Sequence, residues 1–153
     1  MKKGCVNMKL LIDTNVVLDV LCAREGFVEA ASLIWKRCEL GLDEGYLSAL
    51  SIPNIVYILR KELTPAKTYQ VIEQLMLIFY IVDLRATDLL KAAVEQSKDY
   101  EDQLQIVAAQ RIKADYIVTR NVRDFQDSPV AVITPNQLIE NIKCKFNITL
   151  NET

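Results

Sequence analysis

The sequence predicts an α/β fold of three layers, in which helices cover both faces of a central parallel sheet of about five strands. Short apolar runs of strand length alternate along the chain with longer segments of helical periodicity. The chain has 153 residues, of which 51% are hydrophobic and 25% charged, as in a single soluble domain. We therefore expect one domain at residues 8–144, with an extension at 1–7 and a tail at 145–153.

The first strand is expected at residues 9–12, an apolar run that ends at Asp13. Such a run with a polar end is typical of a buried strand. A helix with an asparagine cap follows at 15–22. A second helix is expected at 27–40, because its apolar residues recur at helical spacing and Gly41 ends it.

The next strand and two helices carry clear start signals. The second strand is expected at 45–49. Ser51 then caps a helix with Pro53 in its first turn, where a missing N–H costs nothing. Thr64, followed by a proline, repeats this signal for a helix that runs to about Leu77.

The second half of the chain continues the alternation of strands and helices. The expected elements are a strand at 79–82, helices at 87–98 and 101–113, strands at 115–119 and 130–133, and a helix at 135–143. The tail at 145–153 is open to two interpretations, an edge strand or a frayed end. The whole order predicts parallel strands joined by helical crossovers.

The chain contains no histidine, and this excludes more chemistry than any other feature of its composition. Ser-His-Asp and Cys-His nucleophiles and zinc sites with imidazole ligands are ruled out. Catalysis would have to use carboxylates, hydroxyls, amides, lysine, cysteine or a metal held by oxygen, which favours hard cations. The formal net charge of −2 neither indicates nor excludes a nucleic-acid partner, because local patches decide that.

The cysteine pattern and the apolar runs predict where the protein works. Four cysteines occur without a C-x-x-C pair, so neither a zinc site nor a disulfide framework is indicated. The longest clean apolar run, at 75–82, is far shorter than the roughly 20 residues that span a bilayer. We therefore expect a cytoplasmic protein without a membrane partner.

Acids and amides gather where the expected strands end, which is where open α/β sheets place their ligands. They are Asp13, Asn15, Asp99, Glu101, Asp102, Asn121 and Asp124. Carboxylates brought together repel one another unless a cation such as Mg²⁺ or Mn²⁺ lies between them. Each residue taken singly could instead be an ordinary cap or turn residue, so their joint placement carries the functional interpretation.

Three segments in order resemble the PIN-domain family. They read LIDTN at 11–15, KDYEDQLQ at 98–105 and IVTRNVRDF at 117–125. The resemblance spans about residues 8–142. PIN domains are metal-dependent ribonucleases, and many are toxin components of bacterial toxin–antitoxin pairs. The resemblance therefore implies RNA as substrate, an antitoxin protein as a possible partner and a homodimer.

The resemblance also implies which residues act. The catalytic and metal-binding carboxylates would be Asp13, Asp102 and Asp124, and Thr119 and Asn121 would support them. We expect one firmly bound Mg²⁺ or Mn²⁺, with a second ion doubtful.

The sequence departs from the family pattern at two places in the expected site. Asn54 stands at or near a position that normally holds glutamate, and Asn121 stands where many relatives have aspartate. An amide oxygen coordinates a cation more weakly than a carboxylate does. Asp99 or Glu101 could compensate for the lost charge. Asn54 could equally be an ordinary polar residue of its helix.

Several alternatives stay open at this stage. Arg120 and Arg123 could hold substrate phosphates or simply pair with nearby acids. Arg60 and its neighbour Lys61 are expected to be a solvated helix end. The chain could be a catalytically weakened PIN-like module that binds RNA or a partner protein. A receiver or phosphohydrolase is less consistent with the sequence, because Asn15 stands where a phosphohydrolase usually has a second aspartate.

Overall fold

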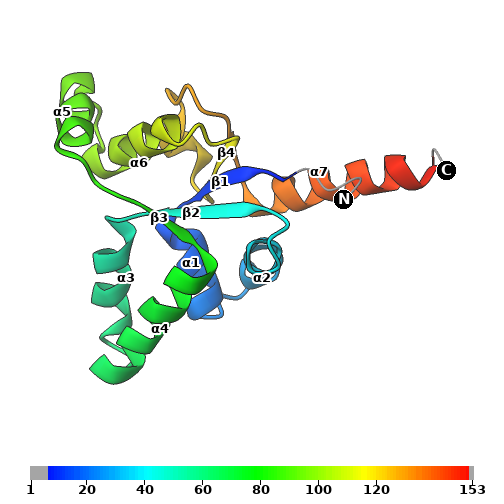
Figure 1. Ribbon diagram of the computed structural model, residues 1–153, viewed down its shortest axis with the longest axis horizontal. Coiled ribbons are helices and arrows are strands. Elements are labelled where there is room, and N and C mark those ends of the chain that lie inside the picture. The colour runs from blue at the N-terminus through cyan, green and yellow to red at the C-terminus, as the bar shows by residue number, and fades with distance from the viewer. Residues whose placement is uncertain (1–6, 152–153) are drawn as a thin grey trace.

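The computed structural model describes residues 7–151, with side chains as far as Lys145. The described chain contains a five-stranded sheet, all parallel, with the order β3-β2-β1-β4-β5 (Figure 1). The strands are β1 (Lys9–Ile12), β2 (Glu44–Ser48), β3 (Tyr80–Val82), β4 (Tyr116–Val118) and β5 (Val132–Ile133). The predicted parallel sheet is confirmed. Residues 1–6 of the expected extension lie outside the described part of the chain.

The helices follow the predicted order. They are α1 (Thr14–Leu21), α2 (Val28–Glu39), α3 (Ser51–Leu59), α4 (Pro65–Ile78), α5 (Ala86–Glu95), α6 (Tyr100–Arg111), the short 3-10 helix η1 (Val122–Phe125) and α7 (Pro135–Asn151). The short η1 was not predicted. The last helix was expected to end at residue 143, with an edge strand or a frayed end after it, whereas α7 continues to Asn151 through a segment that has no glycine or proline to stop it.

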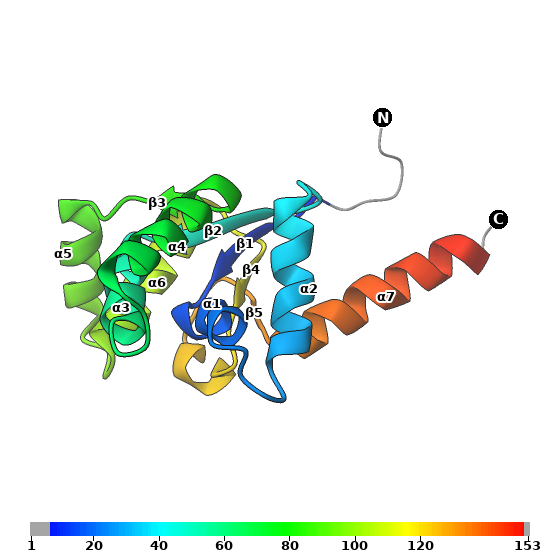
Figure 2. The same cartoon turned by 90° about the horizontal axis from the view of Figure 1, so that it is seen from below.

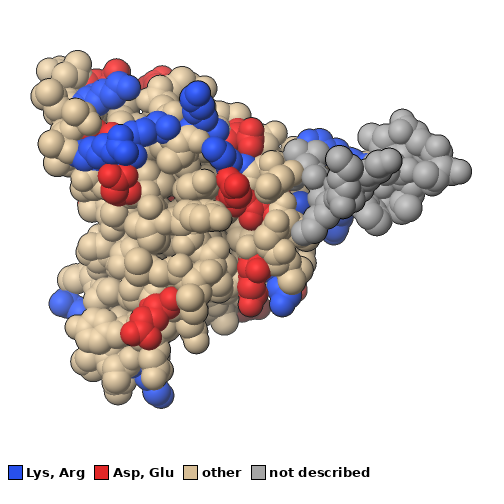
Figure 3. Space-filling model, in the orientation of Figure 1, with Lys and Arg blue, Asp and Glu red and all other residues tan. Residues whose placement is uncertain are grey.

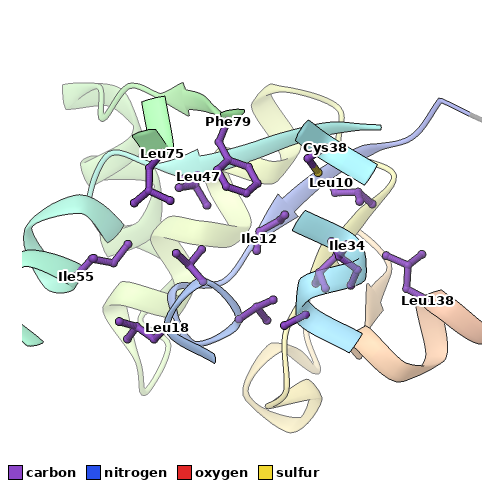
Figure 4. Close-up of a cluster of buried hydrophobic side chains, with 14 of the residues drawn as sticks. Leu10, Ile12, Leu18, Ile34, Cys38, Leu47, Ile55, Leu75, Phe79 and Leu138 are labelled. Atoms are coloured by element: carbon purple, nitrogen blue, oxygen red, sulfur yellow. The ribbon is translucent and has the colours of Figure 1, made fainter. Parts of the chain in front are cut away.

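The two faces of the sheet carry different helices. Successive side chains of a strand point to opposite faces, so Leu10 and Ile12 face one layer and Leu11 faces the other. Leu10 and Ile12 belong to a buried cluster with side chains of α1, α2, α3, α4 and α7 (Figure 4). Leu11 belongs to a second cluster with Ile106 and Ala109 of α6. The result is the predicted three-layer arrangement.

Glycine is required at one point in this packing. A Cβ at Gly45 of β2 would lie 2.7 Å from both the Sγ of Cys38 and the Cδ1 of Phe79. Gly45 therefore lets α2 and the end of α4 approach the sheet closely. Beyond α2, α7 leads away from the sheet (Figure 2).

The strand order places a crevice beside β1. β1 pairs with β2 on one side and with β4 on the other, so the order of the strands proceeds from β1 towards both edges of the sheet. Ligands of open α/β sheets bind at such a switch point, outside the carboxyl ends of the strands. The fold therefore directs attention to the residues that follow β1 and β4.

The remaining sequence predictions concern cysteines and membranes. Cys22, Cys38 and Cys144 carry free thiols, and Cys5 lies outside the described residues. Burial, together with the nearby Asp43 charge, raises the pKa of the Cys38 thiol to about 12. Cys38 is thus an inert core residue. None of the described helices is long and apolar enough to cross a membrane.

Candidate active site

A cleft of about 420 Å³ lies at the expected place, beyond the carboxyl ends of β1 and β4. Residues of α1, α3, α6 and the β4–η1 turn line it. They are Asp13, Thr14, Asn15, Leu50, Ser51, Asn54, Tyr57, Ile58, Asp99, Glu101, Asp102, Gln105, Asn121 and Asp124. The lining contains five carboxylates and no lysine or arginine.

Asp13 is the most firmly held carboxylate of the cleft. It follows β1, its backbone N–H donates to the carbonyl of Val118 at 2.9 Å, and its side chain is buried. Gln105 Nε2 donates to Asp13 Oδ1 at 3.0 Å, and Thr119 Oγ1 donates to Asp13 Oδ2 at 2.8 Å. The Thr119 hydroxyl in turn accepts the backbone N–H of Asn121 at 3.0 Å. Both oxygens of Asp13 are therefore oriented by groups from other elements.

Asp102 lies in the first turn of α6, opposite Asp13. Asp99 caps this helix, and its Oδ1 accepts the backbone N–H of Asp102 at 3.0 Å. Burial and, to a smaller extent, the charges of its acidic neighbours together raise the pKa of Asp102 to about 7, and these neighbours are Asp99, Asp13, Asp124 and Glu101. The carboxylates of the cleft thus act on one another as like charges in a confined space.

The two asparagines that depart from the family pattern both face the cleft. Asn54 projects from α3 and Asn121 from the turn after β4. Beside them, Thr14 Oγ1 donates to Ser51 Oγ at 2.7 Å, which ties the start of α1 to the start of α3. Thus the cleft brings together all the predicted carboxylates and amides. The predicted Thr119 lies behind Asp13.

The two arginines of the predicted site have different surroundings. Arg120 lies outside the cleft, where its Nε is 2.8 Å from Oδ2 of the fully buried Asp19 and its guanidinium covers the Phe27 ring at 4.1 Å. Arg120 thus pairs with a buried acid, which is the alternative to phosphate binding that the sequence left open, and it does not line the cleft. Arg123 lines a groove that adjoins the cleft and shares Asp124 with it.

Sequence reasoning assigned no role to Gln105. This side chain is 7% exposed, and its Oε1 has no hydrogen-bond partner among the described residues. The available signal was its position three residues after Asp102, on the same side of α6, within a run that is otherwise apolar. A polar residue in such a run has to find a buried partner, and that partner is Asp13.

The donor set of the cleft fits a hard divalent cation. Carboxylate and amide oxygens are the ligands that such ions prefer, and an ion of charge +2 would offset the repulsion between the acids. In the described part of the chain, however, no three Cys, Asp or Glu side chains form a group that could already hold a metal ion. Like-charge repulsion favours such separation until a cation is present.

The fold and the cleft define a class of protein, an α/β domain with an acidic oxygen-ligand site at the switch point of its sheet. The sequence model of the PIN domain matches residues 9–123. The chain therefore belongs to the PIN domain family, whose members are generally nucleases.

Several solved structures share this fold at low sequence identity. DNA-bound VapBC from Salmonella typhimurium has a TM-score of 0.63 and 18% identity, covering 84% of this chain and 98% of that one. A toxin–antitoxin complex from Klebsiella pneumoniae has a TM-score of 0.62 and 21% identity, covering 82% and 97%. FitAcB from Neisseria gonorrhoeae has a TM-score of 0.57 and 20% identity, also covering 82% and 97%. The search of curated proteins gives no match.

Proposed function

We propose that this protein is an endoribonuclease that uses Mg²⁺ or Mn²⁺ to hydrolyse RNA phosphodiesters, and that it is the toxin of a toxin–antitoxin pair. The observation that carries the proposal is the orientation of Asp13 by Gln105 and Thr119 in a cleft with four further carboxylates. Membership of a family of nucleases supports phosphodiester chemistry.

The proposed mechanism assigns each residue a task. When bound, the ion lowers the pKa of a water molecule and neutralises charge on the phosphate. Asp13 would hold the ion in a preset geometry, since both of its oxygens keep a free lone pair beside their hydrogen bonds. Asp102 and Asp124 would supply further oxygens, and Asn54 and Asn121 would contribute neutral amide oxygens. The smaller total charge favours one firmly bound ion.

The proposed partner is an antitoxin that covers the acidic cleft. The similar structures from Salmonella typhimurium and Klebsiella pneumoniae are toxin–antitoxin complexes, which supports this extension to our chain. The same proposal includes that the toxin is a homodimer and acts in the cytoplasm.

The test is cleavage of RNA by purified protein with Mn²⁺. We expect Asp13→Asn and Asp102→Asn each to reduce the rate at least about 100-fold, because each removes a charge that acts on the reacting group. Glu140→Gln is the matched control, since Glu140 is an exposed acid of α7 outside the cleft. Equal cleavage by the wild type and both cleft variants would indicate a contaminating nuclease and overturn the proposal.

A second candidate is a weakened PIN module that binds RNA or a protein without cleaving. The amides at Asn54 and Asn121 favour it, because they remove two charges from the cleft. Calorimetric titration with Mn²⁺ separates the two candidates. Binding that Asp13→Asn abolishes supports the nuclease, and no binding at millimolar Mn²⁺ supports the second candidate.

A further inference from the structure

One wall of the cleft ends in an aromatic and basic surface. It consists of Tyr57, Arg60 and Lys61, and we refer to it as the Tyr57 surface. Tyr57 is 55% exposed. The guanidinium of Arg60 lies 4.0 Å from the centre of the Tyr57 ring, and the ammonium of Lys61 lies 5.8 Å from it. Two positive charges thus lie against one exposed ring at the C-terminal end of α3.

The charges of this surface are not used within the protein. No ion pair among the described residues includes Arg60 or Lys61, whereas Arg37, Arg111 and Arg120 each lie against an aspartate. Arg60 and Lys61 are both exposed, as expected of a solvated helix end. The structure adds the ring beneath these charges. Cations held on an aromatic face and free of acids are available to a ligand.

The Tyr57 surface adjoins the candidate active site directly. Tyr57 itself lines the cleft, on the same side of α3 as Asn54, which lies three residues earlier. Arg60 lies about 9 Å beyond Asn54 along the helix axis, from a rise of 1.5 Å per residue. On the face shown in Figure 3, most of the surface in the region of α3 and α4 is uncharged.

The composition of the cleft gives a separate reason for a cationic rim. Five carboxylates and no lysine or arginine line the cleft, so its wall repels the phosphates of an RNA strand. An ion at the centre would attract a single phosphate. The neighbouring phosphates need positive charge outside the cleft, and Arg60 and Lys61 provide it at the end of α3.

We propose that the Tyr57 surface binds single-stranded RNA next to the cleavage site. An unpaired base stacks on the Tyr57–Arg60 pair, and the adjoining phosphates contact Arg60 and Lys61. Aromatic rings and guanidinium planes are the surfaces on which single-stranded RNA stacks its bases. This inference rests on the proposed ribonuclease function and specifies which surface holds the strand that flanks the cleaved phosphodiester.

The first test measures binding of a fluorescein-labelled oligouridine by anisotropy in EDTA, so that the RNA is not cleaved. We expect Tyr57→Leu to weaken binding about tenfold, the size of one lost base stack. Arg60→Gln combined with Lys61→Gln should lower the slope of log affinity against log salt by about 1.4, or about 0.7 for each phosphate contact.

Matched controls lie on the neighbouring helices. Tyr69→Leu removes a tyrosine of α4 that is 61% exposed and does not line the cleft. Lys67→Gln combined with Lys91→Gln removes two exposed positive charges outside the cleft. We expect the wild-type affinity from both controls. A duplex RNA of the same length should be insensitive to Tyr57→Leu, because its bases are already stacked.

The second test separates this inference from the proposed function. With Mn²⁺, the Tyr57 and Arg60–Lys61 variants should raise KM for RNA much more than they lower kcat. Asp102→Asn should instead lose kcat. If no protein cleaves RNA, the proposed function fails, and the anisotropy test still decides binding.

Two results would overturn the inference. One is oligouridine binding that is the same for the wild type and both surface variants, which would show that the surface does not contact RNA. The other is an equal loss of affinity for unpaired and duplex RNA with Tyr57→Leu, which would exclude base stacking.

Discussion

The two ends of the parallel sheet use aspartate in opposite ways. At the amino end, Asp43 precedes β2, and its oxygens accept hydrogen bonds from Arg37 Nε at 2.7 Å and from the backbone N–H of Met8 at 3.1 Å. Asp115 precedes β4 and accepts the backbone N–H of Lys9 at 2.8 Å. Each of these acids is satisfied by donors and holds the start of β1 to its neighbours.

Beyond the carboxyl ends of β1 and β4, the aspartates of the cleft gather without a positively charged side chain, whereas Asp83 after β3 pairs with Arg85 and Arg111. The lining of the cleft has five carboxylates and no cationic residue, and the pKa of Asp102 is raised as a result of burial and its neighbours. The acids of the amino end therefore stabilise the fold, while the crowding of charge around Asp102 opposes it. Such an unfavourable arrangement is expected where the charge serves a ligand.

The largest expected effect tests the amino end. Asp43→Ala leaves Arg37 without its buried partner and the Met8 N–H without its acceptor. We expect the free energy of unfolding to fall by about 3 kcal/mol, as for a broken buried ion pair. Urea denaturation measures it.

The same variant should keep its catalytic rate per folded molecule, because Asp43 lies at the opposite end of the sheet from the cleft. A loss below about 0.5 kcal/mol, the range of ordinary surface substitutions, would contradict the assigned role of Asp43.

The second prediction concerns Asp13. Like Asp43 at the amino end, it accepts a hydrogen bond at each of its side-chain oxygens. Gln105→Leu removes the donor to Asp13 Oδ1 but keeps a side chain of similar size. We expect the kcat of RNA cleavage to fall about tenfold, because misplacing a reacting group is costly, with KM for RNA unchanged. Single-turnover kinetics measures it.

Gln105→Leu should change the free energy of unfolding little, because two effects oppose each other. Asp13 Oδ1 loses its donor, which destabilises the fold, and the buried Gln105 Oε1, which has no partner in the described residues, is removed, which stabilises it. Loss of stability together with a higher KM would show that Gln105 serves packing rather than the position of Asp13. Gln103→Leu, on the same helix but outside the cleft lining, is the control.

Local patterns in the sequence were sufficient to predict the sheet and the acids of the cleft. Apolar runs predict the strands, and the carboxyl ends of strands are where open α/β sheets bind ligands. Asp13 and Asn121 could therefore be located without a structure. Contacts between distant segments could not be predicted. The side chain of Arg120 is held by Asp19, about a hundred residues earlier, and Gln105 is bonded to Asp13 from another element. The ring beneath Arg60 depends on side-chain directions at the end of α3.

The smallest expected effect tests the carboxyl end. There, removing an acid should raise the free energy of unfolding, whereas Asp43→Ala at the amino end should lower it. Asp102 retains its proton up to a pKa of about 7 in the folded protein, against about 3.9 in the unfolded chain. Between these values the folded state binds the proton more tightly, so the free energy of unfolding falls as the pH rises. Above pH 7 the penalty is complete, and below pH 4 it is absent.

Asp102→Asn removes this penalty and should therefore stabilise the metal-free protein. Because Asp102 is partly exposed, solvent screening reduces the gain to about 1 kcal/mol at pH 8, and it should vanish by about pH 4. Thermal unfolding in EDTA across this range measures it, with Glu140→Gln as the control. Saturating Mn²⁺ should reverse the order of stability, because only the wild type keeps the Asp102 charge that favours the cation. A destabilised Asp102→Asn protein in EDTA would mean that the carboxyl end is held together like the amino end, and the contrast between the two would fail.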